Sequence, residues 1–217
     1  MLSSLTLTGC DRDGGNGNDT GARIAAELDL AELGIDSSFE GSRTLNALAL
    51  LMSDTFTIEL DAGIFDLVMH RKGEDVSIII ESVKSYTKDG MLYVVDSETM
   101  KYLATELTPS AKAEMESLFE MVEDMTSDLE GMILVSSGTE EFEGEERYYE
   151  EIINEHGSVK YYFDANVLVG AQSTTRGTVI TMNMKITELV PKDAFEFPPH
   201  FTEISAQEAE DYGLNIW

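Results

Sequence analysis

The sequence has little of what catalytic and metal sites are usually built from. It contains one cysteine and three histidines, and it has no His-Glu-x-x-His motif, cysteine pair, Gly-x-Ser-x-Gly motif or phosphate-binding loop. The three histidines, His70, His156 and His200, are not paired at metal-binding spacing. We therefore expect no enzyme activity, no metal and no cofactor.

Basic residues are also scarce. The 14 lysines and arginines face 42 aspartates and glutamates, which gives a formal net charge of −28. Nucleic-acid phosphates and anionic lipid surfaces would be repelled by such a chain, so a nucleic-acid partner is not expected. The simplest role of this charge is solubility, although a high-salt habitat would also select it.

Long apolar runs are absent. The most apolar stretch, Leu45–Met52, is far shorter than the roughly 18 residues that a membrane span needs. It is therefore predicted to be a buried helix or strand. Before it, apolar residues at helical spacing predict a short helix over Ala22–Leu33, ended by Gly34.

The most specific motif lies near the start. Leu7-Thr8-Gly9-Cys10 resembles a bacterial lipobox, in which the cysteine sulfur receives diacylglycerol. A secretory signal has a basic start and about 7–15 apolar residues, whereas only nine residues precede Cys10 and none is basic. We interpret residues 1–10 as a truncated signal peptide. The protein is then expected to be secreted and held on the outer face of the cell membrane by lipid on Cys10. The alternative is a chance match in a disordered tail.

Residues 11–21 are rich in glycine, asparagine and aspartate and contain no large apolar residue, which predicts a flexible linker. The Gly15-x-Gly17 pair follows no strand, so it does not indicate a dinucleotide site. The Asp11-x-Asp13 pair lacks the later ligands of a calcium loop. We expect one domain over residues 22–217.

Two long stretches alternate apolar and polar residues in short runs separated by turns, which is typical of half-buried antiparallel strands. The Asp89-Gly90 pair favours a tight hairpin, because glycine accepts a positive φ. The second stretch, Ile133–Leu189, reads as an antiparallel meander. The clearest runs are Thr55–Leu60, Ile64–His70, Val76–Ile80, Lys84–Thr87, Met91–Val95, Lys101–Ala104, Tyr148–Ile153, Val159–Asp164, Val167–Val169 and Thr178–Thr187.

One long amphipathic helix is predicted between these stretches. Thr108 is a favourable cap, Pro109 fits the first helical position, and Gly131 ends the run. The helix is either packed permanently on the sheet or a mobile lid, and its methionines would suit an adaptable apolar surface. The candidate cavity residues on its apolar stripe are Met115, Leu118, Phe119, Val122 and Met125.

Two further segments carry predictions. Glu140–Glu151 holds seven glutamates, which we interpret as a solvated strand face with a turn at Glu143-Gly144. Near the end, Ser205–Tyr212 has the composition of a short polar helix.

The order of these elements resembles the LolA/LppX-like superfamily of lipoprotein carriers and extracytoplasmic lipoproteins. The resemblance covers roughly Thr55–Ile204, and its best phrases are Tyr86–Asp96, Tyr161–Asp164 and Phe195–Pro199. It implies a mainly β fold (α+β), in which a curved antiparallel sheet, or unclosed barrel, is covered by an amphipathic helix and encloses an apolar cavity. The soluble carriers are not lipidated, so the lipobox indicates an anchored relative.

Two functions follow as expectations. The first is a membrane-anchored lipoprotein that binds a lipid or other apolar small molecule in the cavity. The second is a protein-interaction or envelope-sensor module with a filled core. An apolar pocket of several hundred Å³ would favour the first.

Overall fold

The computed structural model describes residues 19–61, 63, 66–123, 129–154, 157–197 and 199–212, with the side chains of residues 19 and 121–123 excepted. Cys10, Met125, His156 and Trp217 lie outside these residues. The helices are α1 (Asp19–Glu27), α2 (Arg43–Ala49), α3 (Pro109–Glu123) and α4 (Ala206–Asp211), with short 3-10 helices η1 (Ser37–Phe39) and η2 (Leu50–Met52). The strands are β1 (Thr55–Asp61), β2 (Asp66–Lys72), β3 (Asp75–Ile80), β4 (Val83–Lys88), β5 (Met91–Asp96), β6 (Lys101–Glu106), β7 (Ile133–Phe142), β8 (Glu145–Asn154), β9 (Gly157–Asp164), β10 (Val167–Thr175), β11 (Thr178–Thr187) and β12 (Thr202–Glu203).

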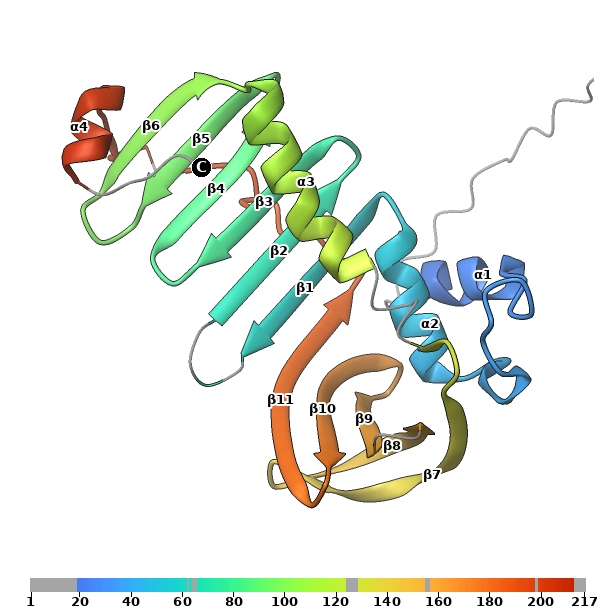
Figure 1. The fold of residues 1–217 in the computed structure, drawn as a ribbon. Coiled ribbons are helices and arrows are strands. Elements are labelled where there is room, and N and C mark those ends of the chain that lie inside the picture. Colours follow the sequence, from blue (N-terminus) through green and yellow to red (C-terminus); the bar gives the residue numbers. More distant parts are fainter. Residues whose placement is uncertain are drawn as a thin grey trace, which may run out of the picture.

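The strands form one twelve-stranded sheet in the order β12-β6-β5-β4-β3-β2-β1-β11-β10-β9-β8-β7. Two antiparallel meanders, β1–β6 and β7–β11, meet where β1 pairs with β11. Only the short β12–β6 pair is parallel among the described strands. The sheet is curved and unclosed, with the β7–β11 part bent away from the β1–β6 part (Figure 1). The predicted mainly β fold, with a curved antiparallel sheet, is confirmed.

The predicted hairpin turns have the expected backbone. Asp89 and Gly90 both take positive φ, at 51° and 77°, and they join β4 to β5. A two-residue turn with both φ values positive follows the twist of the flanking strands. The turn at Glu143-Gly144 has the same signs and joins β7 to β8.

The predicted helix over Ala22–Leu33 is partly wrong. Helix α1 ends at Glu27 because the Asp29 carboxylate accepts the backbone N–H groups of Ala31 and Glu32, each at 3.1 Å, and so forms a turn instead. The predicted linker is also too long, since α1 includes residues 19–21. A side chain at Gly21 would collide with the Asn46 carbonyl, at 2.1 Å, so glycine allows α1 to approach α2 closely.

The Leu45–Met52 stretch belongs to α2 and η2 and is buried except for the half-buried Asn46 and the exposed Met52, so of the predicted helix or strand the helix is correct. The interpretation of the glutamate run as a solvated face is wrong for Glu150, which is 3% exposed. Its carboxylate accepts the backbone N–H groups of Arg43 at 3.0 Å and Thr44 at 2.8 Å. A carboxylate at this position satisfies amides that the first turn of a helix leaves unbonded, so Glu150 fixes α2 to β8.

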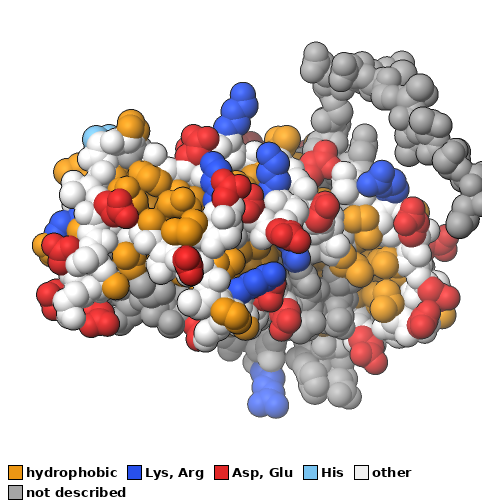
Figure 2. Space-filling view, turned by 90° about the horizontal axis from the view of Figure 1, so that it is seen from above, with side chains coloured by type: hydrophobic (Ala, Val, Ile, Leu, Met, Phe, Trp, Pro, Cys, Tyr) orange, Lys and Arg blue, Asp and Glu red, His pale blue; other side chains and the backbone are white. Residues whose placement is uncertain are grey.

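Each face of the β1–β6 part of the sheet is covered. Helix α3 crosses one face (Figure 1), where apolar side chains of β1 to β6 form the main core with α3. The other face is covered by residues 188–197 and 199–201, here called the strap, which pack on Tyr86 and Val95. Seen from above, carboxylates are spread along the molecule among apolar and basic side chains (Figure 2). No helix in the described ranges is both long and apolar enough to cross a membrane.

Candidate functional site

Helix α3 begins where the sequence predicted. The Thr108 hydroxyl accepts the Ala111 N–H at 3.1 Å, which caps the first turn ahead of the buried stripe. Met115 and Phe119 lie on that stripe and are almost fully buried against the sheet. The Phe119 ring lies 6.0 Å from the Phe56 ring of β1 at an interplanar angle of 56°, a favourable tilted contact.

The predicted cavity residues divide into three groups. Met115 and Phe119 line a pocket beside α3. Leu118 is half-buried and packs against the main core without lining that pocket. Val122 belongs to α3 but its side chain is not described, and Met125 lies outside the described residues.

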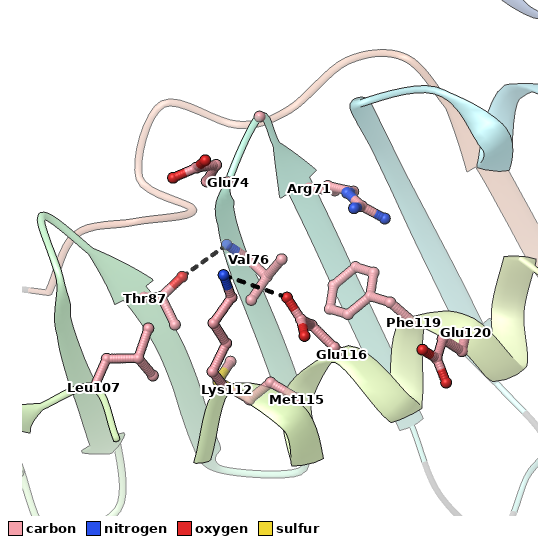
Figure 3. A pocket seen from close by; sticks show the side chains of 11 residues that line it. Arg71, Glu74, Val76, Thr87, Leu107, Lys112, Met115, Glu116, Phe119 and Glu120 are labelled. Atoms are coloured by element: carbon pink, nitrogen blue, oxygen red, sulfur yellow. Dashed lines mark hydrogen bonds and ion pairs between the residues drawn. The ribbon is translucent and has the colours of Figure 1, made fainter. Parts of the chain in front are cut away.

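The pocket has a volume of about 350 Å³ and lies between α3 and the adjoining ends of β2, β3 and β4. This volume is within the range of about 300–1,000 Å³ that small-molecule sites occupy. Figure 3 shows side chains from the strands and from α3 around it. Its apolar lining consists of Val76, Leu107, Met115 and Phe119, and its charged lining consists of Arg71, Glu74, Lys112, Glu116 and Glu120.

Charged side chains make up nearly half of the residues that line the pocket. Lys112 and Glu116 form an ion pair with N–O separation of 3.6 Å on successive turns of α3, and both are half exposed. The Arg71 guanidinium lies 5.9 Å from the centre of the Phe119 ring. Lysine and arginine contribute two positive charges and the glutamates three negative ones, so the pocket mouth has mixed charge with a small negative excess.

The polar group in the pocket wall is already bonded. The Thr87 hydroxyl accepts the backbone N–H of Val76 at 3.0 Å, which joins β4 to β3 at the point where the pocket begins. Within the described ranges, no group of three or more His, Cys, Asp or Glu side chains could hold a metal ion. The described lining of the pocket also includes no cysteine, serine or histidine.

The opposite face of the same strands has a different chemistry. The His70 ring nitrogen Nδ1 lies 2.8 Å from the Thr57 hydroxyl, which donates its one proton to the Leu189 carbonyl at 2.8 Å. His70 Nδ1 must then carry the proton and donate to Thr57. Burial first, and the charge of Lys84 second, lower the pKa of His70 below its usual 6.5, so the ring is neutral at pH 7.

Lysines attach the strap to this face. Lys84 donates to the carbonyls of Asp193 at 2.6 Å and Glu196 at 2.8 Å. Burial lowers the pKa of Lys84, against the opposing effect of the acidic side chains of those two residues. The Phe197 ring of the strap stacks on Tyr102 with centroids 4.3 Å apart. The strap is thus held to the sheet by polar and aromatic contacts.

Several pocket residues were missed by sequence reasoning. Arg71 and Val76 are directly opposite each other on β2 and β3, so both side chains point to the α3 face. This follows only once the strand register is known. A usable signal did exist on α3, where Lys112 and Glu116 are four residues apart beside the Met115 stripe.

The comparisons with known proteins assign no family. No family model matches the chain, and no curated protein sequence matches it. Among solved structures, it is similar to an uncharacterized conserved protein from Thermus thermophilus, with 8% identity and a TM-score of 0.33 over 76% of this chain and 98% of that one. PNGF-II is similar at 7% identity and a TM-score of 0.28, over 76% of this chain and 33% of that one. Values this low carry no inference about function.

Proposed function

We propose that this protein is an extracytoplasmic lipoprotein, held on the outer face of the cell membrane through lipid on Cys10, that binds a small amphipathic ligand in the α3 pocket. The observation that carries the binding proposal is the pocket of about 350 Å³, whose lining combines apolar and charged side chains. The apolar side chains of the lining favour a ligand body without polar groups, and the charged ones favour a polar end that stays near water.

The charges of the protein limit which polar end the ligand can have. The chain carries a net charge of −28, which repels anions over the whole surface. At the pocket mouth, Lys112 is paired with Glu116, and the two remaining carboxylates, Glu74 and Glu120, outnumber the one remaining cation, Arg71. These charges favour a neutral or cationic head group over a free fatty acid or a phosphate monoester.

The second candidate is an interaction or envelope-sensor module with a filled core. It is supported by the packing under α3, where Met115 and Phe119 leave almost no surface exposed. In that case the pocket would be a surface hollow that takes no ligand, and α3 would be a fixed cover of the sheet.

Native mass spectrometry of the protein purified from its own host separates the two candidates. Binding predicts an adduct of small-molecule mass that organic extraction removes and that is reduced in Leu107→Trp, which fills the pocket mouth. The matched control is Leu189→Trp, on a side chain 70% exposed outside the pocket. If neither the parent nor either variant carries an adduct, the result would support the interaction module.

The lipid anchor is tested separately. The full-length precursor should incorporate labelled palmitate and partition with membranes, because the two acyl chains of a diacylglycerol anchor a protein stably. Cys10→Ser should abolish both. If Cys10→Ser is still labelled and still membrane-bound through that label, the anchor proposal is wrong, whatever the pocket binds.

A further inference from the structure

Among the described residues, one end of the β7–β11 part of the sheet carries almost no charge. Glu155 and His156, between β8 and β9, lie outside the described residues. The outward-facing row at this end is formed by residues directly opposite each other on five successive strands. These are Ile133, Ile153, Ser158, Thr174 and Val179. The next row faces inward and is uncharged too: Leu134, Ile152, Val159, Ser173 and Ile180.

This absence of charge is unusual for the chain. Although 42 of its 217 residues are acidic, the sequence from Ala165 to Thr187 contains no aspartate or glutamate. Among the described residues 152–154, 157–159 and 173–180, the one charged side chain is Arg176, in the β10–β11 turn at the bottom of Figure 1. We call these described residues, together with Ile133 and Leu134, the uncharged end.

Apolar side chains at the uncharged end are exposed on both faces of the sheet. Val179 is 55% exposed and Ile180 is 64% exposed, and consecutive strand residues point to opposite faces. Ile133 and Ile153 add exposed apolar surface on the Val179 side. A protein surface lying on one face would bury Val179 or Ile180, but not both. A medium that surrounds the end of the hairpin would bury both.

We propose that the uncharged end inserts into the interfacial layer of a zwitterionic lipid bilayer. Val179 and Ile180 enter the apolar boundary, and Arg176 in the turn lies at the level of the lipid phosphates, which its guanidinium can bind. The 42 carboxylates oppose binding to anionic lipid, but a neutral bilayer presents no net charge, and at physiological salt charges are screened beyond about 8 Å. The uncharged end is a different part of the molecule from the α3 pocket, and this proposal does not depend on what the pocket binds.

Vesicle sedimentation tests this surface in the absence of any lipid anchor. Full-length Cys10→Ser protein should sediment with phosphatidylcholine vesicles at roughly physiological salt. Val179→Asp with Ile180→Asp should reduce the partition coefficient by about tenfold or more, because burying the exposed parts of the two side chains together contributes about that factor. The control is Met52→Asp with Leu189→Asp, two exposed positions elsewhere, which should sediment like the parent.

A second measurement does not depend on a disruptive variant. An environment-sensitive dye attached to Cys10→Ser, Ile180→Cys should shift to the blue on adding the same vesicles, and dye attached at Leu189→Cys should not. Failure of the parent to sediment, equal sedimentation of both aspartate pairs, or equal dye responses would overturn the proposal. So would light scattering showing that the Val179→Asp, Ile180→Asp pair converts a dimer to a monomer, since a second copy would then cover this end.

Discussion

Helix α3 and the strap cover the two faces of the same strands in different ways. Helix α3 contributes apolar side chains such as Met115 and Phe119 to the core and leaves a pocket at its edge. The strap is attached through backbone carbonyls that accept from Lys84, and through the Phe197 ring that stacks on Tyr102. The same six strands therefore present an apolar face to one cover and a partly polar face to the other.

The difference follows from the geometry of the covers. A helix satisfies its own backbone groups, so it can lie over an apolar face, but a single cylinder does not fill the space beside it. An irregular strap must bond its carbonyls elsewhere, and the half-buried Lys84 and the buried Thr57 on the sheet supply donors to them. We propose that the α3 face serves binding and the strap face serves stability, and the following variants test that division.

The largest effect is expected for Phe119→Ala. Phe119 is 2% exposed, and replacing a buried phenylalanine with alanine costs about 3–5 kcal/mol in unfolding free energy. Phe197→Ala in the half-buried strap should cost less, about 1–2 kcal/mol, because less surface returns to water. Urea unfolding of both variants measures the two losses of unfolding free energy. Equal losses would mean that the two covers contribute alike.

Lys84→Met should loosen the strap locally. Two hydrogen bonds from a charged donor are lost, and the strap should open about tenfold more often, as expected for a loss of one to two such contacts. Amide hydrogen exchange at Ala194, whose N–H bonds the Pro191 carbonyl at 3.1 Å within the strap, reports this opening. Exchange along α3 should stay as in the parent. Faster exchange in α3 as well would show that the two faces are coupled.

The strap face should also make stability depend on pH. Because the pKa of His70 is lowered in the folded protein, the unfolded chain binds the proton first as the pH falls. The destabilising contribution of His70 to the free energy of unfolding is absent well above pH 6.5 and grows as the pH drops towards the pKa of the folded state. His70→Gln should lose stability less steeply than the parent between about pH 7 and pH 5. Parallel curves would mean that His70 does not contribute.

The smallest effect on stability is expected for Lys112→Met at the pocket mouth. The exposed ion pair with Glu116 contributes less than about 0.5 kcal/mol, so thermal unfolding should change little. Removing the positive charge should nevertheless raise the affinity for a cationic amphiphile, such as a long-chain alkylamine, by about two- to fivefold. Calorimetric titration checks this, with Lys185→Met as a control for lost charge remote from the pocket.

Local patterns explain why much of the fold was predictable. Alternation and turn residues predicted the meanders. Helical spacing predicted that Leu118 and Phe119 face the sheet, and Phe119 is buried there while Leu118 is half-buried. The role of Glu150 was hidden because its partner amides, at Arg43 and Thr44, lie more than 100 positions away in sequence.

The pocket and the strap also depend on contacts between residues that are far apart in the sequence. Arg71 and Val76 belong to the pocket only because their strands pair in this register. The strap has no periodicity that would indicate which face of the sheet it covers. At Gly170, an added Cβ would lie 2.5 Å from the Phe142 ring. This contact with another strand explains the glycine, and the residues next to Gly170 in the sequence do not predict it.

The central claim, that the α3 pocket binds an amphipathic ligand, is tested most directly by titrating a long-chain alkylamine into the delipidated Cys10→Ser protein. Our account predicts saturable one-site binding that Leu107→Trp abolishes, that Lys112→Met strengthens and that Leu189→Trp leaves unchanged. Equal binding by the parent and Leu107→Trp, or no saturable binding by the parent, would contradict it.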